Sequence, residues 1–159
     1  MKTNNTKKNK GFSIIEVVIA CSIISICVFA LMSSAGKSIQ VSNQALRQAQ
    51  ATLLIEEGVE AVKSIRDNDW DNISNLNLDT DYYLSFNSLW SLNNTPSNID
   101  DIFTRKIVLS AVDRDSNDDI ASSGSNDPGT KKVTVTVSWN KPSGVVNKSL
   151  SFYISNIFN

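Results

Sequence analysis

The feature that most constrains the fold of this sequence is an unbroken apolar segment near its amino terminus. Of the 21 residues from Phe12 to Met32, 17 are apolar, and the exceptions are Ser13, Glu16, Ser22 and Ser25. As a helix rising about 1.5 Å per residue, the segment spans roughly 31 Å, the hydrocarbon thickness of a bilayer. It is longer than the apolar region of a secretory signal peptide, which is about 7 to 15 residues. We therefore expect a membrane-spanning helix.

The charges around this segment predict its orientation. Residues 1–11 contain four lysines and no acid, and only Lys37 follows closely behind the segment. The positive-inside rule then places the amino end in the cytoplasm. The rest of the chain has 11 basic and 16 acidic residues, a net charge of 11 − 16 = −5, which argues against nonspecific nucleic-acid binding. We expect a single-pass protein of the inner membrane with its head outside the cytoplasm.

Glu16 is the one ionisable residue within the apolar segment. An ionised carboxylate costs about 2.5 to 3.5 kcal/mol at the bilayer centre on insertion scales, and less near the interface. One interpretation is that the side chain reaches back to the cytoplasmic interface. The other is that it pairs with a cation of another molecule, because the segment has no Lys, Arg or His. The α-amino group of a second copy, freed by cleavage before Phe12, would serve as that cation.

The stretch KGFSIIEVVIA at residues 10–20 resembles the class III signal of bacterial type IV prepilins and pseudopilins. In that family a short basic leader ends in Gly, Phe follows as the first mature residue, and a Glu lies early in the apolar run. The resemblance implies cleavage between Gly11 and Phe12 by a prepilin peptidase, N-methylation of Phe12, and pairing of Glu16 with a neighbouring subunit's amino group. Ser33 stands where the family often has a helix-kinking Pro.

Apolar residues at helical spacing continue beyond the membrane segment. They recur by sevens and then by threes and fours: Ile39, Leu46 and Leu53, then Ile55, Val59 and Val62. This pattern predicts an amphipathic helix over 34–66 whose stripe docks on the head's own sheet, with packing on a partner helix as the lesser use. We expect a solvated acidic face made by Glu56, Glu57, Glu60 and Lys63. The helix should end near Asp67 and Asn68, and Trp70 and Ile73 should anchor the following loop on the core.

Alternating apolar and polar residues predict three or four antiparallel strands in the rest of the chain. They lie near 82–86, 103–111, 133–139 and 149–155, with an irregular connection over 87–101 and a hairpin loop over about 113–130. One long helix backed by such a sheet gives an α+β, pilin-like fold. The expected organisation is a leader at 1–11, a transmembrane and assembly helix at 12–33, and a head at 34–159. The head also resembles, more weakly, those of minor pilins of the PilV or GspI type.

An Asp-rich stretch is the candidate metal site. Asp113, Asp115, Asn117 and Asp119 are spaced by two, like the oxygen ligands of a calcium loop, but Asp118 stands where that pattern needs Gly and Gly124 where it needs a bidentate acid. We favour a solvated hairpin loop with no cofactor, and calcium remains the alternative.

Catalytic chemistry has little support in this sequence. The chain contains no His, so the usual general base and the commonest metal ligand are both missing, and we predict no catalytic residues. Cys21 and Cys27 lie six residues apart on one helix, too far to bridge each other, and are expected to be packing residues.

The sequence therefore predicts a structural minor pilin or pseudopilin of a type IV pilus or a type II secretion-like filament. Its expected partners are other pilin subunits, the prepilin peptidase and methyltransferase, and the assembly platform in the inner membrane. Adhesion, DNA uptake, motility and secretion all stay open as roles. The alternative is a single-pass anchored protein whose head binds a ligand outside the cytoplasm and which never assembles.

Overall fold

The computed structural model describes residue 11, residues 13–142 and residues 144–157. The chain divides into two compact units, Met1–Leu46 and Arg47–Asn159. Helix α1 spans Ile14–Asn68, so it supplies the described helix of the first unit and also enters the second. All other elements belong to the second unit, which is the head of the molecule.

Helix α1 is continuous because nothing in its sequence interrupts it. Its 55 residues contain no Pro, and the helix passes through both of its glycines, Gly36 and Gly58. It ends at Asn68, as predicted, where poor helix formers begin. A single helical turn, α2 (Asp71–Ser74), follows. Trp70 packs on the core and Ile73 is fully buried, which confirms that these two residues anchor the segment.

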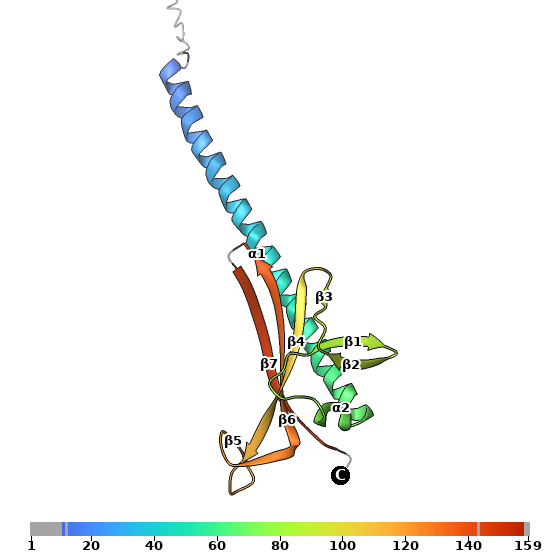
Figure 1. Cartoon of the computed structure of the whole chain (residues 1–159). Coiled ribbons are helices and arrows are strands. Elements are labelled where there is room, and N and C mark those ends of the chain that lie inside the picture. Colours follow the sequence, from blue (N-terminus) through green and yellow to red (C-terminus); the bar gives the residue numbers. More distant parts are fainter. Residues whose placement is uncertain (1–10, 12, 143, 158–159) are drawn as a thin grey trace, which may run out of the picture. The chain divides into compact units, whose positions relative to one another are not determined.

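The head sheet is an antiparallel meander backed by α1 (Figure 1). Its strand order is β3 (Asn98–Ile99), β4 (Phe103–Arg114), β6 (Ser125–Lys141) and β7 (Gly144–Ser155), and β5 (Ile120–Ala121) also pairs with β4. A separate hairpin consists of β1 (Tyr83–Asn87) and β2 (Leu89–Asn93). The predicted α+β fold is confirmed, and the four predicted strands correspond to β1, β4, β6 and β7.

The core forms between the carboxyl-terminal part of α1 and one face of β4 and β6. Odd-numbered residues of the two strands lie opposite each other in register, for example Ile107 with Val135. These inward rows are almost completely buried: Phe103, Arg105, Ile107, Leu109, Val133, Val135, Val137 and Trp139. From α1 they meet residues spaced by threes and fours: Ala51, Ile55, Gly58, Val62 and Ile65. This spacing follows from the helical period, which keeps such residues on one face.

The predicted irregular connection over 87–101 is wrong, because the structure has β2 and β3 there. β1 and β2 are joined through Ser88 alone, whose φ of 66° turns the chain without a Gly. The usual Asn-Gly or Asp-Gly hairpin signal is therefore missing from the sequence. Trp90 and Leu92 nevertheless alternate with polar Ser91, and both pack against the core.

The predicted hairpin loop over 113–130 is also too long. β4 continues to Arg114 and β6 begins at Ser125, so the true connection is shorter and itself contains β5. A register shift between Ala111 and Asp113 interrupts the regular pairing. Turn-forming residues such as Asp127, Pro128 and Gly129 lie within β6 at this irregularity, between Asn126, which pairs with Asp113, and Lys131, which pairs with Ala111.

The apolar stripe of the amphipathic helix divides into two parts. Ile55, Val59 and Val62 pack on the head sheet as predicted. Leu53 does not, since it is 65% exposed, and Ile39 and Leu46 in the first unit are 63% and 57% exposed. Docking on the head's own sheet is therefore wrong for Leu53, because the buried helix face runs through Ala51, Ile55 and Gly58 instead.

Candidate functional site

Of the residues that the prepilin-like signal singles out, the structure describes Glu16, in the first turn of α1, and Gly11, which precedes the helix. α1 begins at Ile14, and the backbone carbonyl of Ser13 accepts hydrogen bonds from the amides of Glu16 (2.9 Å) and Val17 (3.2 Å). Glu16 thus lies in the first turn, where a negative charge is favoured by the helix dipole. Gly11 is exposed and has no heavy atom near its Cβ position. Phe12, the predicted cleavage and methylation residue, lies outside the described residues.

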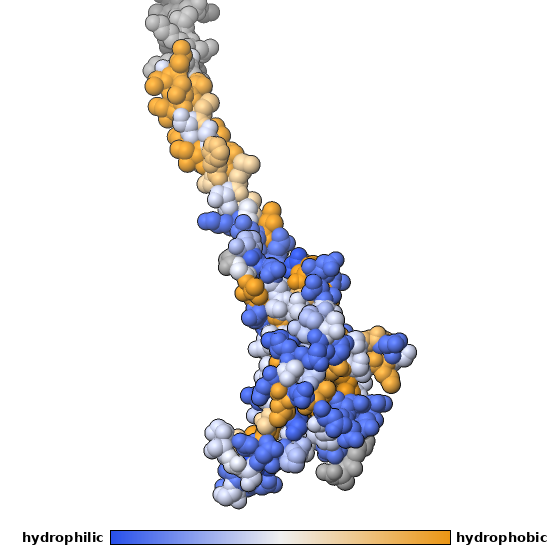
Figure 2. Space-filling model, in the orientation of Figure 1, coloured by the Kyte–Doolittle hydropathy of each residue, from blue (hydrophilic) through white to orange (hydrophobic). Residues whose placement is uncertain are grey.

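From Val17 to Met32 the surface of α1 is almost entirely apolar. Every described residue from Ile14 to Leu46 is exposed, including large apolar side chains such as Ile14 (85%), Phe29 (73%) and Leu31 (70%). Figure 2 shows this as an apolar helical surface at the amino-terminal end. α1 is the one described helix whose length and composition would let it cross a membrane. An apolar surface of this kind needs lipid or other apolar helices around it.

The polar side chains in the apolar segment differ in how they are satisfied. The hydroxyl of Ser22 donates to the carbonyl of Val18, and that of Ser25 donates to the carbonyl of Cys21, both at 2.8 Å. These two serines thus need no partner outside the helix. The Glu16 carboxylate, by contrast, forms no hydrogen bond or ion pair with any described residue. Glu16 is therefore the charged group of this segment that requires an external partner.

Cys21 and Cys27 are free and exposed on α1. The prediction that they cannot bridge each other agrees with this state, because six helical residues separate them. Their expected role in packing stays a prediction, since the first unit places no other element against them.

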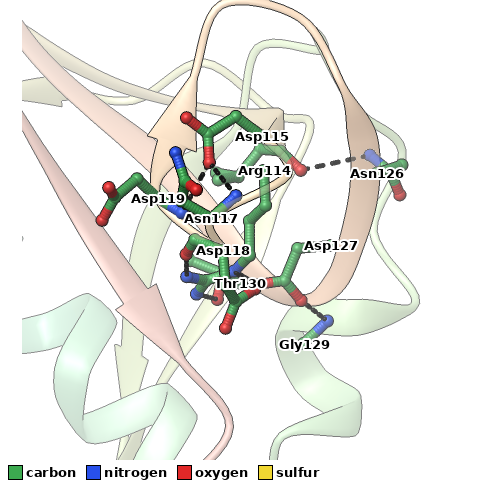
Figure 3. A network of polar contacts seen from close by, with 10 residues as sticks. Arg114, Asp115, Asn117, Asp118, Asp119, Asn126, Asp127, Gly129 and Thr130 are labelled. Atoms are coloured by element: carbon green, nitrogen blue, oxygen red, sulfur yellow. Dashed lines mark hydrogen bonds and ion pairs between the residues drawn. The ribbon is translucent and has the colours of Figure 1, made fainter.

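The Asp-rich connection is organised around an arginine (Figure 3). Nε of Arg114 donates to Oδ2 of Asp127 at 2.7 Å, and its Nη1 donates to the carbonyl of Asp118 at 2.8 Å. Oδ1 of Asp115 accepts from the backbone amides of Asn117 (2.8 Å) and Asp119 (3.1 Å), which closes the loop on itself. These contacts use Asp115 and Asp127 to fix the loop backbone and the Arg114 side chain.

The pKa values of this pair shift in opposite directions. The hydrogen bond from Arg114 lowers the pKa of Asp127, and a hydrogen bond from Thr130 adds to the effect. The same bond to Asp127 raises the pKa of Arg114. Both shifts favour the charged forms, so the ion pair is present over the whole neutral range.

The four candidate calcium ligands are not gathered into one cluster. Asp113 lies within β4, opposite Ala121 and Asn126, while Asp115 is engaged with the loop backbone. Among the residues that the structure describes, no group of three or more His, Cys, Asp or Glu side chains is placed to hold one metal ion. Asp118 and Asp127, which the ligand pattern does not include, meet at Arg114 instead.

A buried arginine forms an ion pair that the sequence pattern does not predict. Arg105 is 6% exposed, and its Nη1 lies 3.0 Å from Oε2 of Glu57 and 2.9 Å from the carbonyl of Leu54. Glu57 is 46% exposed and so lies on the predicted solvated face, where Glu60 and Lys63 also form an exposed pair. The alternation of the strand contains the signal for this pair. Arg105 falls between Phe103 and Ile107 in the row of alternate residues that faces the core, and a buried cation requires a partner.

The comparisons with known proteins bear on the amino-terminal segment. Residues 6–32 match the family model described as the prokaryotic N-terminal methylation motif, a range that includes Gly11, Phe12 and Glu16. No curated protein and no solved structure gives a significant match to the chain. The motif supports a type IV pilin-like or pseudopilin-like precursor and marks a structural protein rather than an enzyme family. With the apolar helix it supports a membrane-anchored, single-pass protein.

Proposed function

We propose that this chain is a minor pilin or pseudopilin subunit, cleaved between Gly11 and Phe12, N-methylated at Phe12 and built into a filament through α1. The observation that carries the proposal is the state of Glu16: a carboxylate on an otherwise apolar, exposed helix, with no partner among the described residues. Such a group is costly in lipid, so its presence calls for a cation at the same depth.

The amino group released at Phe12 supplies that cation in a neighbouring copy. An α-amino group has a pKa near 8 and is charged at neutral pH. It starts the mature chain only a few residues from Glu16, so the two groups lie at similar depth in adjacent subunits. Because the contact joins different surfaces of two copies and does not close, it propagates as an open helix. One repeated ion pair then sets the register of the filament.

The exposed apolar residues of α1 supply the remaining contact area. Ile39 and Leu46 in the first unit, and Leu53 in the head, are more than half exposed, so they are free to pack on a partner helix. Apolar contacts between membrane helices resemble contacts with lipid and discriminate register poorly. Glu16 therefore provides the specificity and the apolar surface provides the area.

The proposed subunit meets its partners one after another. The prepilin peptidase and methyltransferase act on the precursor in the inner membrane, and the assembly platform then takes up the processed subunit. The four lysines of residues 1–11 hold the amino end in the cytoplasm, which places the head outside the inner membrane. The weaker resemblance of the head to minor pilins favours a minor over a major subunit.

The test compares Glu16→Ala with the wild-type protein. We expect the variant to insert and to be cleaved, since removing the carboxylate lowers the cost of insertion. We expect it to be depleted at least tenfold from sheared filaments, measured as processed protein in filaments relative to membranes. Ser25→Ala is the matched control, because it also removes a polar group from the segment, but one satisfied within the helix.

Two further measurements separate the outcomes. The number of filaments per cell distinguishes a subunit distributed along the filament from one at its tip, where loss of Glu16 would reduce filament number without changing filament composition. Gly11→Val should leave the 159-residue precursor in the membrane, whereas the wild type matures to 159 − 11 = 148 residues by intact mass. Equal filament-to-membrane ratios and filament numbers for Glu16→Ala and wild type would overturn the pairing of Glu16, and absence of the wild-type protein from filaments would favour the plain membrane anchor.

A further inference from the structure

A groove on the head lies between the β1–β2 hairpin and the helical segment that ends α1. The hairpin side of the groove includes Asn87, Leu89 and Trp90, and the helical side includes Asn68, Asp71 and Asn72. The hairpin and α2 lie on the same side of the head in Figure 1. All these residues belong to the second unit, and none takes part in the proposed assembly contact of α1.

An aromatic side chain held in a fixed orientation forms part of this groove. Trp90 is half-buried, and the Arg105 guanidinium carbon lies over its ring at 6.0 Å from the centroid. Phe86 packs against the same ring, with centroids 5.0 Å apart and a tilt of 58°. Phe86 and Leu89 are themselves 64% and 62% exposed and contribute to an apolar patch over the hairpin (Figure 2). The groove thus presents a half-buried aromatic ring that Arg105 covers on one face, with apolar neighbours.

Amide groups line both sides of the groove, Asn68 and Asn72 on the helical side and Asn87 on the hairpin side with Trp90. The side chains of Asn68, Asn72 and Asn87 form no hydrogen bond with any described residue, and all three are exposed. Each amide offers two donor hydrogens and one acceptor oxygen. Asp71 accepts one hydrogen bond, from the Ser74 hydroxyl at 3.3 Å, and retains acceptor capacity. The fold therefore sets free donors and acceptors on both sides of the groove, on the helical side across from the aromatic ring and on the hairpin side that carries it.

The composition of the groove limits the class of ligand that fits it. An apolar helix or acyl chain would leave the three amides desolvated without partners, which is costly. An anion would find no basic lining residue and would face the Asp71 carboxylate. A neutral polyhydroxylated ring matches both sides, because its hydroxyls pair with amides and its C–H faces carry partial positive charge that the face of an indole attracts.

We propose that this groove is a binding site for neutral oligosaccharides. Trp90 stacks on the apolar face of one sugar ring, and Asn72 and Asn87 bind its hydroxyls from opposite sides of the groove. The Arg105 cation fixes the ring orientation of Trp90 from the core. The site acts independently of filament assembly, so the proposal does not require Glu16 to pair as described above.

The test measures direct binding to the full-length protein in a phosphocholine detergent, since detergents with sugar headgroups would compete. Cellohexaose, chitohexaose and a galactose hexasaccharide are titrated by calorimetry, with saturation-transfer NMR to map contacts. We expect at least one of them to bind with millimolar affinity or tighter. Asn72→Ala combined with Asn87→Ala should weaken that binding at least tenfold without changing the circular dichroism spectrum, because both side chains are exposed.

Asn147→Ala is the matched control, since it removes an exposed amide on β7, away from the groove, and should leave affinity within twofold. Trp90→Phe tests the stacking surface and should weaken binding while keeping an aromatic ring in place. An acidic hexasaccharide, oligogalacturonate, is the charge control and should bind more weakly than the neutral sugars. Absence of binding to all three neutral sugars, equal binding by the double variant, or preference for the acidic sugar would each overturn the proposal.

Discussion

Gly58 packs closely against the head sheet, and replacing it by Ala has two opposing effects on stability. A Cβ at Gly58 would lie 2.9 Å from Cγ1 of Val135 and 3.1 Å from Cδ of Arg105. Carbon atoms pack best at about 3.5 to 4.0 Å, so Gly58→Ala needs a displacement of several tenths of an ångström. Gly58→Ala also gains about 1 kcal/mol of helix propensity.

Neither neighbour of Gly58 can move cheaply. Val135 is completely buried in the central strand, and a β-branched side chain has few alternative rotamers. Arg105 is held by Glu57 and by the carbonyl of Leu54. Overpacking of this kind costs about 1 to 3 kcal/mol. We therefore expect Gly58→Ala to lower the free energy of unfolding of the head by about 1 kcal/mol, despite the better helix former.

A double-mutant cycle isolates the contact. Val135→Ala removes the nearest atom, so in that background Gly58→Ala should become neutral or stabilising, with a coupling energy of about 1 kcal/mol or more. The assay is urea unfolding of the full-length protein in detergent, followed by tryptophan fluorescence. Gly36→Ala is the control, because no atom lies near its Cβ position. The same penalty in both backgrounds, or stabilisation by Gly58→Ala alone, would refute the packing argument.

Three further outcomes follow from the head. The pKa of Asp127 is lowered, mainly by Arg114, so the ion pair stabilises the fold above the ordinary carboxyl pKa. Asp127→Asn should therefore be less stable than the wild type at pH 7. The difference between their urea midpoints should vanish as the pH is lowered to about pH 2. Millimolar calcium should leave the thermal midpoint unchanged, and a rise of many degrees that a chelator reverses would show that the Asp113–Asp119 stretch binds the ion. A fragment beginning at Gly36 should be soluble and monomeric by size exclusion, since it retains every core residue of the head but lacks the membrane segment.

Most of the head could be predicted from the helical spacing of apolar residues in α1 and from the alternation of apolar and polar residues in the strands. The inward rows of β4 and β6 follow strict alternation, and such alternation reports one buried face whatever the connections are. The end of α1 was equally accessible, because Asp67 and Asn68 favour turns over helix interior. Strand β2 could not be predicted from the sequence, because the turn before it depends on a positive φ at Ser88. Non-glycine residues adopt this conformation only when the surrounding structure imposes it.

The sites also differ in whether the sequence alone reveals them. Glu16 was identifiable because a charge in an apolar segment violates a local rule. The Glu57–Arg105 pair was not, because Glu57 alone resembles any exposed helix residue, and its role depends on a strand 48 residues away in the chain (105 − 57). The prediction for Leu53 is wrong for a different reason: Leu53 is two residues, or about 200° of helical rotation, from Ile55, so it lies on the face of α1 opposite the buried one.

The meander topology has a consequence for the order in which the head folds. β4, β6 and β7 each pair with a neighbour in the chain, so their hairpins close short loops and form quickly. Helix α1 is synthesised well before them, yet its docking face waits for partners such as Arg105, 51 residues beyond Leu54. Until β4 and β6 have emerged, Ile55, Val62 and Ile65 are exposed to water and to other nascent chains. The interval between synthesis of the helix and arrival of the sheet is therefore when this head is most vulnerable to aggregation and proteolysis.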